Sequence, residues 1–105
     1  MRCTNCRLNL ETLKQMHEDH TEFRTAAGRN KLWIVEVNES SQTIRMERST
    51  GTITPPLDFQ KLRQIHDRIQ RGELILDQYV IDEAVPTWGN YITGLLKHLG
   101  CFMNR

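Results

Sequence analysis

The chain has 105 residues, a hydrophobic share of 38%, and 14 basic against 13 acidic side chains, for a formal net charge of +1. This length corresponds to one ordinary domain, or to a small module joined to a small domain. The near-neutral balance argues against a surface that is basic all round, so any nucleic-acid contact must come from local clustering of cations. No apolar run reaches the length of a membrane span or a signal-peptide core, so we expect no membrane partner.

The N-terminal stretch carries four side chains of the types that bind zinc. Two residues separate Cys3 from Cys6, and two residues separate His17 from His20. A tight turn can direct both thiolates at one point, and residues three apart on a helix project from one face. Four such ligands leave no open position on the metal, so the spacing predicts a structural rather than a catalytic Zn²⁺.

The histidines fall in a segment with helical periodicity. Apolar side chains recur from Leu8 to Phe23, and Asn9 is suited to be the N-cap, which predicts a helix over this range. Other interpretations remain open: a Cys-x-x-Cys redox pair normally follows a strand, and a zinc-protease helix has its histidines four apart. The plainest alternative is that the thiols are free and the histidines are solvated.

On these residues the stretch resembles a Cys2His2 zinc finger, most closely the short prokaryotic variety. Leu10 and Leu13 or Met16 stand in the usual hydrophobic places. The resemblance implies a zinc-binding module over residues 1–27. It departs from the family in the short gap between the histidines and in having only two residues before Cys3.

The remainder, residues 31–105, is predicted to form a β-hairpin followed by three helices. The segments 32–38 and 43–48 alternate apolar and polar side chains, with 52–54 as a third short strand that ends at Pro55-Pro56. Helices are predicted over 57–71, 76–84 and 88–99, with Asp58 and Thr87 as N-caps. The expected core of this part consists of Trp33, Val35, Leu62, Ile65, Ile69, Ile92 and Leu96. The chain is therefore expected to be an α+β protein, with its last two helices arranged like a helix-turn-helix.

Two groups of side chains are candidates for contact with nucleic acid. Arginines can hold phosphates, and the outer side of the last helix carries groups that can read base edges or hold a phosphate. The arginines are Arg45, Arg48, Arg63, Arg68 and Arg71, and the helix residues are Asn90, Thr93 and Lys97. Both groups have an ordinary alternative, which is a solvated surface whose arginines pair with Glu47, Asp67 and Glu73. Gly94 would permit another backbone to approach the helix closely.

The sequence thus predicts a small zinc-binding regulatory protein that binds nucleic acid. The alternative is a protein–protein adaptor or inhibitor in which zinc is purely structural, with Trp33 and Trp88 as natural anchors if exposed. No enzyme is expected, because the sequence offers no nucleophile–base pair and no phosphate-binding loop. The odd number of cysteines and the absence of an export signal predict a reducing, cytoplasmic location.

Overall fold

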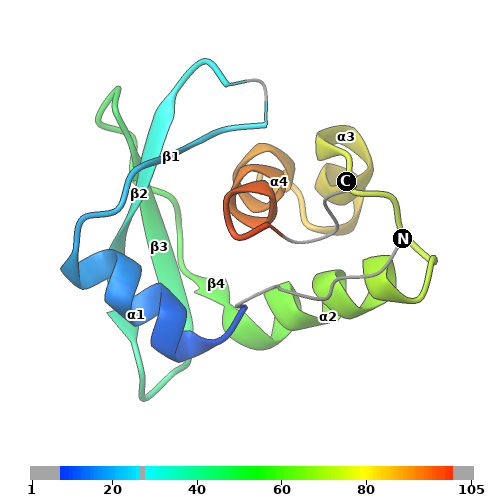
Figure 1. Ribbon diagram of the computed structural model, residues 1–105, viewed down its shortest axis with the longest axis horizontal. Coiled ribbons are helices and arrows are strands. Elements are labelled where there is room, and N and C mark those ends of the chain that lie inside the picture. Colours follow the sequence, from blue (N-terminus) through cyan, green and yellow to red (C-terminus); the bar gives the residue numbers. More distant parts are fainter. Residues whose placement is uncertain (1–7, 27, 101–105) are drawn as a thin grey trace.

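The computed structural model describes residues 8–26 and 28–100. Within these residues the chain forms four helices and a four-stranded antiparallel sheet, which makes it an α+β protein as predicted. The helices are α1 (Leu10–Glu18), α2 (Phe59–Gln70), α3 (Gln78–Ala84) and α4 (Gly89–His98). The strands are β1 (Phe23–Arg24), β2 (Lys31–Asn38), β3 (Thr43–Arg48) and β4 (Leu57–Asp58), and they lie in the sheet in this order. Figure 1 shows α2, α3 and α4 on one side of the sheet, with α1 beside β2.

The predicted hairpin is confirmed as β2 and β3, but the prediction of its buried face was wrong. Leu32 and Ile34 enter the core, whereas Trp33 and Val35 are half-buried on the opposite face. Four consecutive apolar residues at 32–35 give no alternation that could decide between the two faces. The pairing of β2 with β3 shifts between Ile34 and Glu36, and this bulge returns Val37 to the core side.

The described strand edges are covered by other parts of the chain. Beyond the end of β1, His17 Nδ1 lies 2.9 Å from Ile34 O, so α1 occupies the edge of β2. On the far side, segment 53–58 follows β3, with a bridge at Ile53 and the two-residue β4 in place of the third strand predicted at 52–54. Prolines 55 and 56 stand between them and cannot donate to a further strand.

The helix predicted from Leu8 to Phe23 begins as expected but ends earlier. Asn9 Oδ1 accepts from Thr12 N at 2.8 Å, which confirms the N-cap. The helix ends at Glu18 because His20 adopts the left-handed conformation, with φ 52°. Thr21 N then donates to Met16 O, and His20 N to His17 O, which is the Schellman pattern of a helix end. The freed chain places Phe23 in β1, which the sequence did not predict.

The helix α2 agrees closely with its prediction. Its buried stripe is Phe59, Leu62, Ile65 and Ile69. Asp58 Oδ1 accepts from Gln60 N at 2.9 Å, which confirms the predicted N-cap. The start differs by two residues, since Leu57 and Asp58 pair with β3 before the helix begins.

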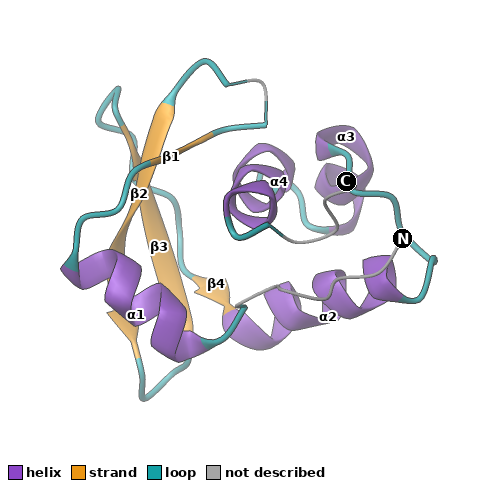
Figure 2. Ribbon diagram, viewed as in Figure 1, coloured by secondary structure: helices purple, strands orange, loops and turns teal. Residues whose placement is uncertain are grey.

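The two last helices pack against each other, and α4 occupies the centre of the molecule (Figure 2). The predicted cap at Thr87 was wrong, because the N-cap is Trp88 and Thr87 has a φ of 73°. Gly89, Ile92 and the run Thr93–Leu96 are all buried. A recognition helix needs a continuous exposed face. In α4 only Lys97 and His98, at the C-terminal end, are exposed, so the helix has no such face.

One hydrophobic core joins both predicted parts of the chain. Leu13 and Met16 from α1 and Phe23 from β1 belong to the same buried cluster as Ile34, and that cluster continues to Leu96 of α4. The described portion of the predicted N-terminal module is therefore packed into the core that the sheet and the later helices share.

Candidate nucleic-acid interface

Half of the predicted zinc ligands lie outside the described residues, namely Cys3 and Cys6. The other half, His17 and His20, stand at the end of α1 and just after it. Among residues 8–26 and 28–100, His, Cys, Asp and Glu form no group of three or more that could hold a metal ion.

His17 keeps one ring nitrogen available for a metal. Its Nδ1 lies 2.9 Å from the carbonyl oxygen of Ile34, and a carbonyl can only accept, so the proton of the neutral ring sits on Nδ1. The lone pair is then on Nε2. Metal-bound histidines commonly donate their other ring nitrogen to a backbone carbonyl in this way, so His17 suits a ligand role through Nε2.

His20 is placed differently from the prediction. It lies outside the helix, so the expected projection of both rings from one helical face is wrong. Its ring lies against Trp33, with centroids 5.0 Å apart, and its Nε2 is 4.0 Å from Glu22 Oε2. Trp33 in turn donates from Nε1 to Glu47 Oε1 at 3.1 Å.

The five predicted arginines belong to β3, to α2 and to the C-cap of α2, and each has a partner within the protein. Arg45 pairs with Glu36 at 3.6 Å on one face of the sheet. Arg48 is directed toward α4, where Nη1 donates to Tyr91 Oη at 3.3 Å.

The α2 arginines are also engaged. Arg63 Nη1 donates to Leu8 O at 2.7 Å, which ties α2 to the chain entering α1. Arg71 donates two hydrogen bonds to Glu73, and Arg68 lies 3.9 Å from the same carboxylate. These contacts, led by the hydrogen bond from Arg71, lower the pKa of Glu73 below its ordinary value. The alternative interpretation, in which the arginines pair with acidic side chains, is confirmed for Arg68 and Arg71 with Glu73.

The expected outer side of α4 is largely turned inward. Thr93 is only 1% exposed, and Asn90 Oδ1 accepts from Ala26 N at 2.9 Å, so the expectation that both residues face solvent was wrong. Lys97 is exposed as predicted. The reason is that β1 packs on this side of α4, where Gly94 lies directly against the backbone of Arg24. The predicted close backbone approach at Gly94 therefore comes from within the protein.

Two hollows adjoin β1, the larger beside α4 and the smaller beside Lys31 of β2, and together we call them the β1 groove. One hollow measures about 410 Å³ and the other about 200 Å³, and they share Glu22, Phe23 and Arg24. The remaining lining residues are Thr25, Lys31, Gly94, Lys97 and His98. The groove thus joins residues of the N-terminal third of the chain with the C-terminal end of α4.

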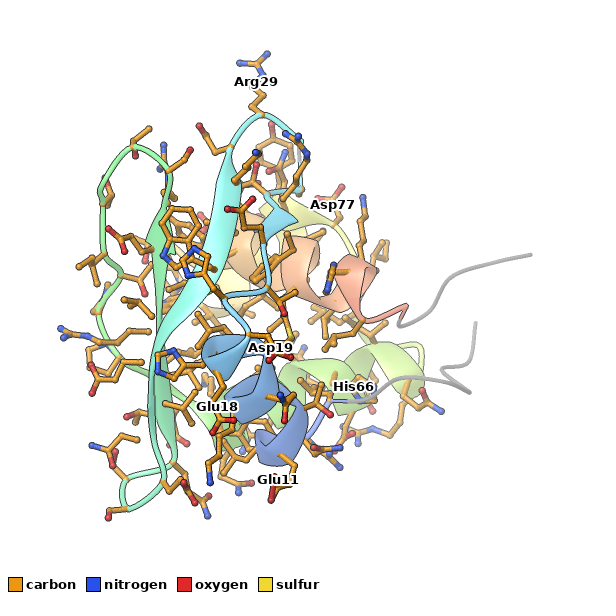
Figure 3. The ribbon with its side chains drawn as sticks, turned by 60° about the vertical axis from the view of Figure 1, so that its left-hand side comes forward. Glu11, Glu18, Asp19, Arg29, His66 and Asp77 are labelled. Atoms are coloured by element: carbon orange, nitrogen blue, oxygen red, sulfur yellow. The ribbon has the colours of Figure 1, made fainter. Side chains whose placement is uncertain are left out.

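The charged side chains of the β1 groove are mostly cationic. Arg24, Lys31 and Lys97 carry positive charge, and Glu22, at 3.6 Å from Lys31, carries the opposing negative charge. Arg24 Nη1 donates to Gly28 O at 3.2 Å and so supports the loop that carries Arg29. Figure 3 shows Arg29 at the tip of this loop, far from the acidic side chains Glu11 and Glu18 of α1. In the groove itself, three cations face one carboxylate, although the net charge of the chain is only +1.

Another hollow, separate from the two of the β1 groove, measures about 490 Å³ and lies between α1 and the end of α4. We call it the α1–α4 hollow. Its lining is mostly polar and consists of Thr12, Gln15, Met16, Asp19, Thr21, His98 and Leu99. His98 belongs to both this hollow and the β1 groove, so the two adjoin. The His98 ring also lies 5.6 Å from that of Phe23.

The sequence interpretation missed Arg24, Lys31 and His98 as surface partners of Lys97. A signal was present, because three cations, Arg24, Arg29 and Lys31, fall within residues 24–31. What the sequence could not show is that α4 lies beside this segment.

Comparison of the chain with protein-family models, with curated proteins and with solved structures finds no match in any of the three. Among the helices that the structure describes, none combines the length and the apolar character that crossing a bilayer requires.

Proposed function

We propose that this protein is a non-catalytic nucleic-acid-binding module that holds the phosphate backbone in the β1 groove. The observation that carries the proposal is that Arg24 lines both hollows of the β1 groove, with Lys97 beside it in one and Lys31 in the other. Cationic side chains supply most of the affinity for a polyphosphate backbone, and a local cluster is sufficient when the net charge is small. Lys97 keeps the phosphate-binding role predicted from the sequence, and Arg24 and Lys31 take the place of the five arginines.

The proposal carries a quantitative expectation for salt. If about three phosphates are neutralised, the logarithm of the binding constant should fall with the logarithm of salt concentration with a slope of about −2 for a single strand. Polyglutamate is a useful competitor, because it carries negative charge without the regular phosphate spacing of a nucleic acid. It should therefore bind more weakly than the oligonucleotide.

Fluorescence anisotropy with a short labelled oligonucleotide at about 50 mM and about 200 mM salt tests the proposal. Lys97→Ala should weaken binding similarly for all sequences and reduce the slope by about one unit. The matched control is Lys61→Ala, which removes an exposed lysine from α2. The proposal is overturned if no binding occurs at low salt, if polyglutamate binds as tightly as the oligonucleotide, or if Lys61→Ala weakens binding as much as Lys97→Ala.

We also propose that Cys3, Cys6, His17 and His20 hold a structural Zn²⁺. The support is the donor set in the sequence together with the Nδ1 hydrogen bond of His17, which leaves its Nε2 available. Zinc would supply a cross-link between the N-terminal residues and α1, with no role in chemistry. Zinc thiolates require reduced cysteines, which accords with a cytoplasmic location as part of the same proposal.

A second candidate function is a docking module for another protein, and one observation favours it. Ile75, in the loop before α3, is 70% exposed, and Tyr79, in the first turn of α3, is 74% exposed. Exposed tyrosines are common anchors of protein interfaces. The two functions separate by salt and by variant: Tyr79→Ser should abolish an apolar interface and leave oligonucleotide binding unchanged, and added salt should weaken only the latter.

A further inference from the structure

Around the β1 groove, the described elements leave no helix or strand free to enter the groove of a duplex. The central part of α4 is buried, since Thr93 and Gly94 face β1. The exposed helix α1 carries Glu11 and Glu18, which would be repelled by phosphates. The described sheet edges are covered by α1, α4 and segment 53–58. A backbone in the β1 groove must therefore present its bases sideways to the protein surface.

The surface beside the β1 groove is the α1–α4 hollow, which begins at the shared His98. Its volume of about 490 Å³ lies within the range of small-ligand pockets, about 300–1,000 Å³. Its polar groups line the walls, and Met16 and Leu99 add apolar contact. Single-stranded nucleic acids are recognised mainly through unstacked bases that enter such hollows.

The hydrogen-bonding pattern in the hollow is set by Gln15 and Asp19. Gln15 Nε2 donates to Asp19 Oδ2 at 3.0 Å, and a carboxylate can only accept, so this orientation of the amide is fixed. The pair then brings two further acceptors to the lining of the hollow, Gln15 Oε1 and the second carboxylate oxygen of Asp19. Asp19 is the C-cap of α1. Figure 3 shows that Asp19 lies closer to α4 than Glu18 and Glu11 do.

We propose that the ligand is single-stranded and that one unpaired guanine occupies the α1–α4 hollow while the adjoining phosphates lie in the β1 groove. Guanine presents two adjacent donors on its Watson–Crick edge, N1–H and the N2 amino group, which match the acceptors of Gln15 and Asp19. Uracil and thymine flank a single donor with two carbonyl oxygens, which the Asp19 carboxylate repels. This inference rests on the proposed function, because it requires the backbone to bind in the β1 groove.

The first test compares strands that differ in one base. A labelled pyrimidine-rich strand with one central guanine is compared with the same strand carrying thymine or inosine, and with its duplex. Inosine lacks the N2 amino group, so it isolates that contact. We expect the guanine strand to bind about fivefold or more tighter than the thymine strand, with inosine between them, and the duplex to bind most weakly.

The second test uses a charge-matched pair of variants. Asp19→Asn replaces an acceptor by an amide and should remove most of the preference for guanine. Glu18→Gln removes the same charge one residue away, outside the hollow, and should keep the preference. Circular dichroism of both variants verifies that α1 is intact.

The possible outcomes distinguish failure of the guanine site from failure of the proposed backbone binding in the β1 groove. If no strand binds at low salt, both are overturned. If strands bind through Lys97 but without base preference, or if the duplex binds as tightly, the β1 groove stands and the guanine site is wrong. Equal effects of Asp19→Asn and Glu18→Gln on the preference would also overturn the guanine site.

Discussion

Gly94 of α4 lies so close to Arg24 of β1 that a Cβ on Gly94 would overlap the carbonyl oxygen of Arg24. The neighbouring atoms are backbone, which cannot rotate away as the end of a flexible side chain can. This contact brings Lys97 beside Arg24, so the β1 groove depends on a residue without a side chain.

Gly94→Ala is therefore expected to destabilise the protein by about 2 kcal/mol or more, because the added methyl must push β1 away from α4. Urea unfolding followed by circular dichroism measures the change. The control is Lys97→Ala on the same helix, which should stay within about 0.5 kcal/mol of the parent protein. A Gly94→Ala protein of unchanged stability would mean that β1 does not pack on α4 in solution.

Thr93 supplies a second stability prediction. Its hydroxyl is buried, and among the described residues it has no hydrogen-bond partner. Thr93→Val keeps the shape and removes this cost, so it should stabilise the protein by up to about 1 kcal/mol. Thr93→Ser keeps the hydroxyl, loses a methyl group and should destabilise by about 1 kcal/mol. Greater destabilisation by valine than by serine in thermal unfolding would reveal a hydrogen bond at this hydroxyl. Neither change should alter base preference.

The pKa of Glu73 offers a prediction about pH. Arg71 holds this carboxyl in its charged form, so its pKa is lowered in the folded protein. The pair therefore favours the folded state above the ordinary pKa of a glutamate, and this contribution is lost as pH falls through the lowered value. Arg71→Ala should raise the pKa of Glu73 toward the ordinary value in an NMR titration of side-chain carboxyls, whereas Lys61→Ala should not. An unmoved pKa in Arg71→Ala would mean that the ion pair does not form.

The zinc proposal predicts one Zn²⁺ per chain by elemental analysis, with loss of metal in His17→Ala and in His20→Ala. His98→Ala is the matched control and should retain the metal. Because Leu13 and Met16 lie in the shared core, chelation should lower the unfolding free energy of the whole protein. Purified protein that is metal-free and yet has an ordered α1 would contradict the proposal.

The elements predicted well were those with a long periodic pattern and a cap. The stripe from Phe59 to Ile69 and the cap at Asp58 determine α2 locally, so no knowledge of the rest of the fold was needed. The two strands of the hairpin were also predicted from local pattern, but the buried face of β2 was not, because residues 32–35 are all apolar. By contrast, β1 is two residues long, and no periodicity exists over such a length. Its position is fixed by pairing with β2 and by packing on α4, which are both distant in sequence.

The candidate site was predicted less well for a related reason. Exposure of Asn90 and Thr93 was inferred from the apolar stripe of α4 alone, and β1 covers the side opposite that stripe. Gly94 is the local sign of this arrangement, because glycine costs a helix about 1 kcal/mol relative to alanine and suits a place where another backbone approaches closely. Lys97 was identified correctly because it lies in the last turn of α4, where the helix is exposed.

The hydrogen bonds from Ala26 N to Asn90 join residues 64 positions apart, and they have a consequence for the order in which the chain folds. The hairpin and α2 are built from neighbours in sequence and can form early. The outer strand gains its packing partner only when α4 is in place, so closing this long loop should be a late step. During synthesis, β1 would wait for the C-terminal helix to leave the ribosome. Until then, β1 would lack the helix on which it packs, and the β1 groove would lack Lys97.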